Sequence, residues 1–221
     1  RGGDNGQADA MYSVHPVGLP IVAAPAFAAG GYRAVVVLMI LLASGASALA
    51  WTWARRVTGS VASATFAWSA TALSLPFLAN AGTVYPEVPA ALVVMAAVTL
   101  ARADGRLATG DRTDDQGAMG PWRALLLGLC AAALPWLHAK YALLSAALVA
   151  IGVWREWRAR PAGRWTRSRL AALAAVPYAA SVAGWMAFHT LVWGSPWPSA
   201  PYGGAAGTQM SLASLVRGVP G

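Results

Sequence analysis

Six apolar stretches, separated by short polar gaps, limit the fold of this chain more than any other feature. They cover about 34–54, 60–80, 86–102, 121–137, 140–154 and 170–193. A membrane-spanning helix needs about 20 apolar residues, and the third and fifth stretches approach this length only with their polar ends in the interface. The sequence therefore predicts an all-α fold, a polytopic transmembrane bundle of about six spanning helices.

Composition supports a membrane protein over a soluble one. Of the 221 residues, 57% are hydrophobic and 11% are charged, whereas a soluble domain carries about 25% charged residues. The spans are rich in Ala, Gly and Ser, as in residues 43–48. Small side chains allow the close helix contacts on which bundles in lipid depend.

The placement of the basic residues predicts an orientation. If the six spans alternate, twelve arginines fall on one side: Arg55, Arg56, Arg102, Arg106, Arg112, Arg123, Arg155, Arg158, Arg160, Arg164, Arg167 and Arg169. The other side receives only Arg1, Arg33, Lys140 and Arg217. Cytoplasmic loops carry the excess of Lys and Arg, so we expect a multi-pass protein of the cytoplasmic (plasma) membrane with both ends of this sequence outside. The net charge of +8 then needs no nucleic-acid partner.

The remaining segments complete a single transmembrane domain over residues 1–221. Residues 1–16 are interpreted as the end of an outer loop, 34–193 as the six helices and 194–221 as another outer loop. Residues 17–30 are apolar but too short to span, contain Pro20 and Pro25, and end at Gly30-Gly31, so we interpret them as an outer-face interfacial helix. Because the sequence starts at Arg1 rather than Met, we expect it to be a piece of a longer protein.

The basic loop after the fifth stretch predicts contact with membrane lipids. It runs from Arg155 to Arg169 and has Trp154, Trp157 and Trp165 in or beside it. Trp residues favour the membrane interface, and clustered arginines attract anionic headgroups.

Glu87 and Lys140 are the main candidates for a functional site, because charges at membrane depth are costly and often functional. Glu87 opens the third stretch after Pro86; it either complements the helix dipole or binds a sugar hydroxyl or a divalent metal ion. Lys140 is the only lysine and lies on the cation-poor side. It either snorkels to the interface or binds a phosphate as a compact point charge.

Other polar residues on the predicted outer side are weaker candidates. His138 precedes Lys140 in the same turn, and Tyr85 and Tyr141 flank the two charged residues; each has an alternative as a turn or interfacial residue. His15, before the 17–30 segment, is either a turn residue or a ligand, and His189 is interpreted as a buried core histidine. The single Cys130 and the lack of phosphate-loop, dinucleotide or zinc-protease motifs exclude several soluble-enzyme classes.

Three short motifs together resemble the GT-C membrane glycosyltransferases. They are His15-Pro16-Val17-Gly18-Leu19-Pro20, Tyr85-Pro86-Glu87-Val88-Pro89 and Leu134-Pro135-Trp136-Leu137-His138-Ala139-Lys140-Tyr141. The stretch from Gly194-Ser195-Pro196 to Tyr202-Gly203 is similar to an outer segment of these enzymes. The closer resemblance is to the branch of protein mannosyltransferases and aminoarabinose transferases, which use polyprenyl-phosphate-linked sugars.

This resemblance implies a function and a role for each candidate residue. It implies a glycosyltransferase that moves a sugar from a polyprenyl phosphate to an acceptor on the outer face, with Glu87 as a secondary acidic residue and Lys140 and His138 at the lipid phosphate. Tyr85, Tyr141 and His15 would line the substrate site. The family's main acidic motif follows an initial membrane helix, and Asp4 and Asp9 do not match it. We therefore expect the catalytic base outside this sequence.

Two other classes remain open. A transporter or flippase for a lipid-linked or anionic substrate would carry polar residues at mid-membrane depth, whereas the candidates here cluster at the outer ends of the spans. In a non-catalytic scaffold, Glu87 and Lys140 would only be helix-end charges.

Overall fold

The computed structural model describes residues 16–101, 120–158 and 166–197, and in these ranges every regular element is a helix. The predicted all-α class is therefore confirmed. The chain divides into two compact units. The larger is Val17–Trp185, and the described part of the smaller is Pro16 with 186–197.

The first helix, α1 (Gly18–Thr58), is interrupted at two glycines. Gly30 and Gly31 both leave helical geometry, and Gly31 has φ 63° and ψ −153°, a combination that essentially only glycine adopts. We call residues 18–29 the arm, to distinguish them from the long part of α1 that follows. The arm coincides with the segment interpreted above as an interfacial helix, whose membrane position remains a prediction.

A sharp bend separates α2 (Val61–Ala72) from α3 (Leu75–Ala81), with an angle of 65°. The Oγ of Ser60 accepts a hydrogen bond from the backbone N–H of Ser63 and caps α2. The second helix starts with a proline in its first turn, Pro76, a position where the missing N–H costs nothing. The sequence predicts one span over 60–80 with a kink at Pro76, which removes a backbone donor. The structure shows this stretch broken into two helices just before that proline.

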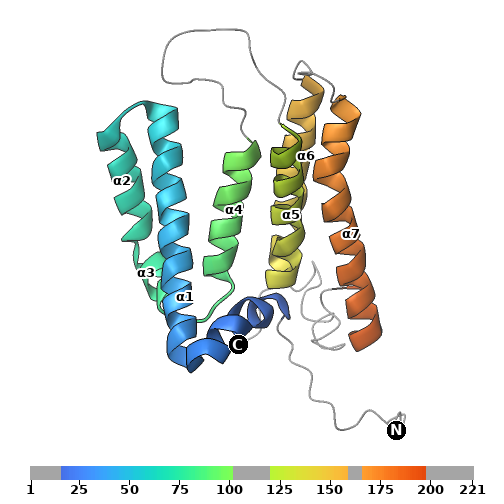
Figure 1. Ribbon diagram of the computed structural model, residues 1–221, viewed down its shortest axis with the longest axis horizontal. Coiled ribbons are helices and arrows are strands. Elements are labelled where there is room, and N and C mark those ends of the chain that lie inside the picture. Colours follow the sequence, from blue (N-terminus) through green and yellow to red (C-terminus); the bar gives the residue numbers. More distant parts are fainter. Residues whose placement is uncertain (1–15, 102–119, 159–165, 198–221) are drawn as a thin grey trace, which may run out of the picture. The chain divides into compact units, whose positions relative to one another are not determined.

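The remaining helices follow in chain order, and their parts within the larger unit lie side by side (Figure 1). They are α4 (Glu87–Ala101), α5 (Pro121–Leu137), a single 3₁₀ turn η1 (Ala139–Tyr141), α6 (Ala142–Arg158) and α7 (Arg167–Trp193). Helix α4 packs against both α1 and α5, and α5 packs against α6. The turn η1 connects α5 to α6 directly, and this connection carries Lys140.

Small residues let these helices approach closely. Buried alanines from α4, α5 and α7 form much of the core with Leu127 and Leu134. A Cβ on Gly128 would lie 2.5 Å from the carbonyl oxygen of Ala174, so α5 and α7 are in backbone contact there. A polar link supports this crossing: Trp136 Nε1 donates to Ser181 Oγ at 2.9 Å, and Ser181 Oγ donates to the Ala132 carbonyl at 2.7 Å.

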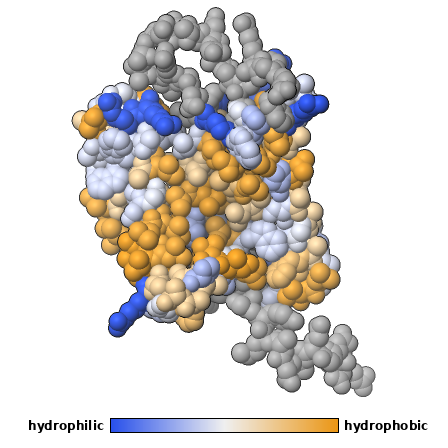
Figure 2. Space-filling model, viewed as in Figure 1, coloured by the Kyte–Doolittle hydropathy of each residue, from blue (hydrophilic) through white to orange (hydrophobic). Residues whose placement is uncertain are grey.

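Two of the described helices, α1 and α7, are long and apolar enough to cross a membrane, and a third span results if the bent pair α2–α3 counts as one. Helices α4 and α5 are apolar but have 15 and 17 residues. The structure therefore supports membrane association with two or three spans, fewer than the predicted six. Figure 2 shows apolar residues over the sides of the helices and hydrophilic residues gathered at the upper end.

The smaller unit contains the end of α7. Gly194 follows the helix with φ 71°, and its N–H donates to the Thr190 carbonyl at 2.9 Å. His189 is buried, as expected, and its ring meets the edge of the Phe188 ring at 6.1 Å between centroids.

Candidate functional site

An ion pair joins the two charged residues that the sequence singled out. Lys140 Nζ donates to Glu87 Oε1 at 2.6 Å, although the residues are 53 positions apart in the sequence. The side chains are 49% and 38% exposed, so both groups are reachable from outside the helices. The structure thus brings the start of α4 and the turn after α5 together at one end of the larger unit, which we call the ion-pair end.

Local structure holds each partner in place. Glu87 is the first residue of α4 and follows Pro86, whose carbonyl accepts the first helical hydrogen bond, from Ala90 N–H, at 3.0 Å. A carboxylate in the first turn is also favoured by the positive end of the helix dipole. On the other side, His138 Nδ1 accepts from the backbone N–H of Lys140 at 3.2 Å. The role of His138 in this geometry is to cap the turn that carries Lys140.

The Tyr141 ring forms a second contact to the ammonium. Lys140 Nζ lies 5.2 Å from the centroid of the ring, within the range of a cation–π attraction. The same ring meets His138 edge-on, with centroids 6.2 Å apart and an interplanar angle of 76°. The ammonium is therefore held between a carboxylate and an aromatic face, and this arrangement limits its rotamers.

These contacts change the acidity of the two groups in the turn, which lies outside the helices on either side. The hydrogen bond to Glu87 raises the pKa of Lys140, and partial burial opposes this effect only in part. Partial burial, followed by the negative charge of Glu87, raises the pKa of Tyr141. Near neutral pH, Lys140 is therefore a fixed positive charge and Tyr141 is a neutral phenol.

The carboxylate of Glu87 keeps one oxygen outside the ion pair. Its Oε2 is buried and has no hydrogen-bond partner among the residues that the structure describes. The predicted alternative of a metal ligand fits poorly, because no group of three or more His, Cys, Asp and Glu side chains that could hold a metal occurs in the described ranges. We therefore derive no chemistry through a metal ion at Glu87.

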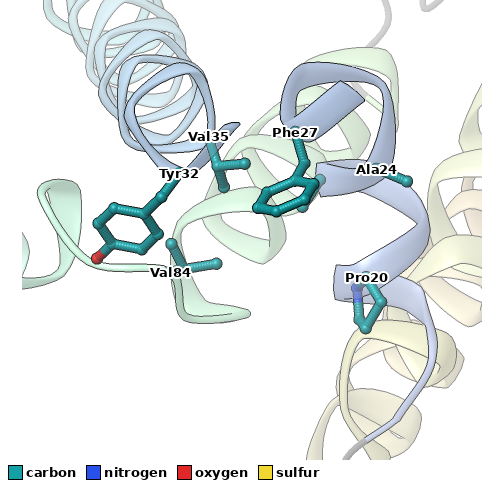
Figure 3. A pocket seen from close by; sticks show the side chains of 7 residues that line it. Pro20, Ala24, Phe27, Tyr32, Val35 and Val84 are labelled. Atoms are coloured by element: carbon teal, nitrogen blue, oxygen red, sulfur yellow. The ribbon is translucent and has the colours of Figure 1, made fainter. Parts of the chain in front are cut away.

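An apolar groove opens beside the segment that leads to Glu87. Its volume is about 350 Å³, and it lies between the arm, the start of the long part of α1, and Val84. Figure 3 shows Phe27 of the arm and Val84 facing the groove, with Tyr32 and Val35 at its side. Val84 is three residues before Glu87, so the Cα atoms of these two residues are at most about 11 Å apart. The groove therefore lies near the ion pair.

A close backbone contact fixes the start of the arm against the end of α5. A Cβ on Gly18 would lie 2.4 Å from the carbonyl oxygen of Trp136 and 2.9 Å from the amide nitrogen of Leu137. Only glycine permits this approach, since real Cβ atoms do not come so close. Trp136 and Leu137 directly precede His138, so the arm reaches from the groove to the turn that carries Lys140.

Two predicted site residues remain, Tyr85 and His15. Tyr85 is 57% exposed and lies in the segment between α3 and α4. His15 and the outer loop beyond residue 197 lie outside the described residues. Of the six residues predicted for the site, the structure brings together Glu87, Lys140, His138 and Tyr141.

The groove was missed in the sequence because its lining looks like ordinary apolar sequence. Phe27, Val35 and Val84 come from three separate segments, and their meeting depends on the break at Gly30-Gly31. One usable signal was present: two adjacent glycines between two apolar segments predict a change of direction.

Comparison of the chain with known protein families, with curated proteins and with solved structures finds no match. The functional argument therefore rests on the geometry of the ion-pair end and on the chemistry of its residues.

Proposed function

We propose that this chain is part of a membrane glycosyltransferase that moves a sugar from a polyprenyl-phosphate donor to an acceptor on the outer face of the cytoplasmic membrane. The observation that carries the proposal is the Lys140–Glu87 pair, 2.6 Å between Nζ and Oε1, beside an apolar groove. A lipid phosphate needs a cation for its headgroup and an apolar surface for its chain, and this end of the molecule offers both.

Lys140 would bind the phosphate and stabilise it as it leaves. In the transfer, the bond between the anomeric carbon and the phosphate oxygen breaks, and a bond from the same carbon to the acceptor oxygen forms. Negative charge then accumulates on the lipid phosphate, where a positioned ammonium lowers the barrier. The ammonium of Lys140 suits this role because it is half-exposed and keeps its proton.

Glu87 would orient the acceptor hydroxyl through its second oxygen. Oε1 holds Lys140, while Oε2 is buried and has no hydrogen-bond partner in the described part of the chain. The side chain, which is 38% exposed as a whole, would have to turn for Oε2 to accept a hydrogen bond from a sugar or protein hydroxyl. The proton that the acceptor hydroxyl loses passes to a general base, which the resemblance to GT-C enzymes assigns to an acidic residue outside this sequence.

The groove would take the first part of the polyprenyl chain. The side chains that line it are apolar or aromatic, and Phe27 and Tyr32 are 61% and 63% exposed, which suits contact with lipid rather than with water. In this proposal α1, the pair α2–α3, α4, α5, α6 and α7 are the six spans, and the twelve arginines face the cytoplasm.

A transporter or flippase of a lipid-linked anion is the second candidate, and the broken helices favour it. Helix α1 is interrupted at Gly30-Gly31 and the α2–α3 pair bends by 65°, and discontinuous helices are common at transporter sites. Against it, α1 to α7 carry Asp, Glu, Lys or Arg only in their end turns, apart from Arg33 of α1, which lies just after the break at Gly30-Gly31.

The proposal is tested with the longer protein in detergent, using polyprenyl phosphate as the binding probe and a panel of polyprenyl-phosphate sugars as donors. We expect Lys140→Gln to weaken polyprenyl-phosphate binding about tenfold or more, since it removes a charge-assisted hydrogen bond. Glu87→Gln should leave that binding measurable and reduce sugar transfer. Arg33→Gln is the matched control, since Arg33 is an exposed cation directly after the groove residue Tyr32.

Three outcomes would contradict the assignment. Unchanged binding and transfer in both variants would remove the ion pair from the site. An equal loss of polyprenyl-phosphate binding in Arg33→Gln would show that any nearby cation contributes as much as Lys140. Movement of lipid-linked sugar across vesicles without any transfer to an acceptor would favour the flippase.

A further inference from the structure

The end of the larger unit opposite to the ion pair carries seven arginines of the described ranges, and we call it the arginine end. The 17 residues of α5 separate the two ends by about 25 Å. The arginines lie where four helices end or begin: Arg55 and Arg56 on α1, Arg123 on α5, Arg155 and Arg158 on α6, and Arg167 and Arg169 on α7. The hydrophilic band at the upper end of Figure 2 lies where α1 and α6 end.

Helix dipoles account for only part of this charge. The arginines of α1 and α6 lie in last turns, where a cation is favoured. Arg167 and Arg169 instead lie in the first turn of α7, where the dipole opposes a cation. The one carboxylate described at this end, Glu156, is 2% exposed. Among the described residues of this end, seven arginines and one carboxylate therefore leave a positive surplus that an external anion would relieve.

An exposed aromatic and a stacked guanidinium give this end a specific contact pair. The guanidinium carbon of Arg158 lies 4.3 Å from the centroid of the Trp154 ring, and the two residues share one face of α6 because they are four positions apart. Trp154 and Trp157 are 54% and 55% exposed. A guanidinium stacked on an indole still presents its N–H edge, which fits a phosphate.

We infer that the arginine end binds anionic phospholipid headgroups, with Arg158 on the phosphate and Trp154 beside it at the level of the glycerol. Two observations favour a lipid over another polyanion. The arginines stand directly above apolar helix sides, such as Ile151 of α6, which is 50% exposed. Exposed indoles also favour the membrane–water interface. The sequence predicted a lipid contact from the 155–169 loop alone. The present inference adds the ends of four helices and assigns the headgroup contact to Arg158 and Trp154.

The test measures lipid retention by the purified full chain in detergent. Phosphatidylglycerol and phosphatidylcholine are added at equal concentration, and bound lipid is counted by native mass spectrometry, with the thermal unfolding midpoint as a second readout. We expect selective retention of phosphatidylglycerol and a rise of the midpoint with this lipid only. Arg158→Gln should lower the affinity about fivefold, the effect of one cation near an anionic surface, and Trp154→Leu should lower it as well.

The controls separate a lipid site from general charge and from misfolding. Arg33→Gln, at the ion-pair end, should retain phosphatidylglycerol as the native chain does. Arg158→Lys should recover part of the affinity, and Arg158→Gln should keep the lipid-free unfolding midpoint. Equal retention of both lipids, an equal loss in Arg33→Gln, or the same stabilisation by free glycerol phosphate or by an oligonucleotide would overturn the inference.

Discussion

The two ends of the larger unit place cations in different surroundings. At the ion-pair end, Lys140 is held by Glu87 at 2.6 Å and by the Tyr141 ring. At the arginine end, Arg158 stacks on Trp154, and the only described carboxylate is buried. An exposed salt bridge adds about 0–1 kcal/mol to stability, so the Lys140–Glu87 pair contributes little to folding. The first fixes one charge at one point, whereas the second spreads many charges over a surface.

This difference separates two kinds of anion binding. In the proposed function, a single positioned ammonium beside a groove would bind one phosphate and act on it, because a hydrogen bond fixes its place. In the further inference, several arginines and exposed indoles would bind a charged layer at no single point. Variants that disturb one end of the larger unit and leave the other intact test whether the two ends bind anions independently.

The largest effect is expected from Gly18→Ala, which places a Cβ against the backbone at Trp136. Overpacking of this kind costs about 1–3 kcal/mol, because neither backbone can move without disturbing the end of α5. We expect a lower thermal unfolding midpoint in detergent and weaker polyprenyl-phosphate binding. Phosphatidylglycerol retention at the arginine end should be preserved.

Gly82→Ala is the matched control for this change, since a Cβ there meets nothing within 4 Å. A normal unfolding midpoint in Gly18→Ala would mean that the arm is not packed on α5. Loss of lipid retention together with polyprenyl-phosphate binding would mean that the two ends are one cooperative unit.

A smaller effect is expected from Gly31→Ala, because the φ of 63° and ψ of −153° at Gly31 are strained for any residue with a Cβ. Such strain costs about 1–3 kcal/mol, but here it can be relieved by reorienting the arm. We therefore expect the groove to be altered more than the stability. Polyprenyl-phosphate binding should fall, while the unfolding midpoint should fall less than in Gly18→Ala. A native binding affinity in this variant would show that the groove is not used.

The smallest and most local effect is a change in the titration of Lys140. Since it is the only lysine, reductive ¹³C-methylation gives a single lysine NMR signal beside that of the terminal amine. The pKa of Lys140 is raised by its hydrogen bond to Glu87. While Glu87 is ionised, the ion pair therefore contributes fully below the ordinary lysine pKa, and it is lost as the pH rises through the raised value.

Glu87→Gln should move this titration to lower pH, because the main cause of the raised pKa is removed. Arg158→Gln, at the arginine end, should leave it unchanged and is the control. An identical titration in Glu87→Gln would show that the ion pair does not form in solution.

The sequence predicted the class of the fold and indicated where two of its helices are interrupted, but not the angle of the bend. Long apolar stretches with few charges were sufficient to predict an all-helical fold, because each stretch indicates a helix by its own composition. The 17–30 segment was expected to end at Gly30-Gly31, and Pro76 predicted a kink within 60–80, whereas the angle of 65° between α2 and α3 was not predicted. Helix length and composition support two or three spans, fewer than the six predicted.

The site shows the same division between local and long-range information. Alternating charge placed Glu87 and Lys140 on one side, since topology depends on the order of spans alone. It did not predict that they touch, because their contact depends on the packing of α4 against α5. The groove depends on three segments and on the contact at Gly18, and no property of any one segment indicates it.

The break at Gly30-Gly31 also acts as a depth marker. Two successive residues outside helical geometry cannot keep the regular backbone ladder, and unsatisfied N–H and C=O groups are costly in hydrocarbon. The break is therefore expected at the boundary with water. From there to Thr58, roughly 27 residues rise about 40 Å, close to the full thickness of a bilayer with its headgroups. If α1 crosses a membrane, this places Arg55 and Arg56 level with the phosphates of one leaflet and the arm flat upon the other.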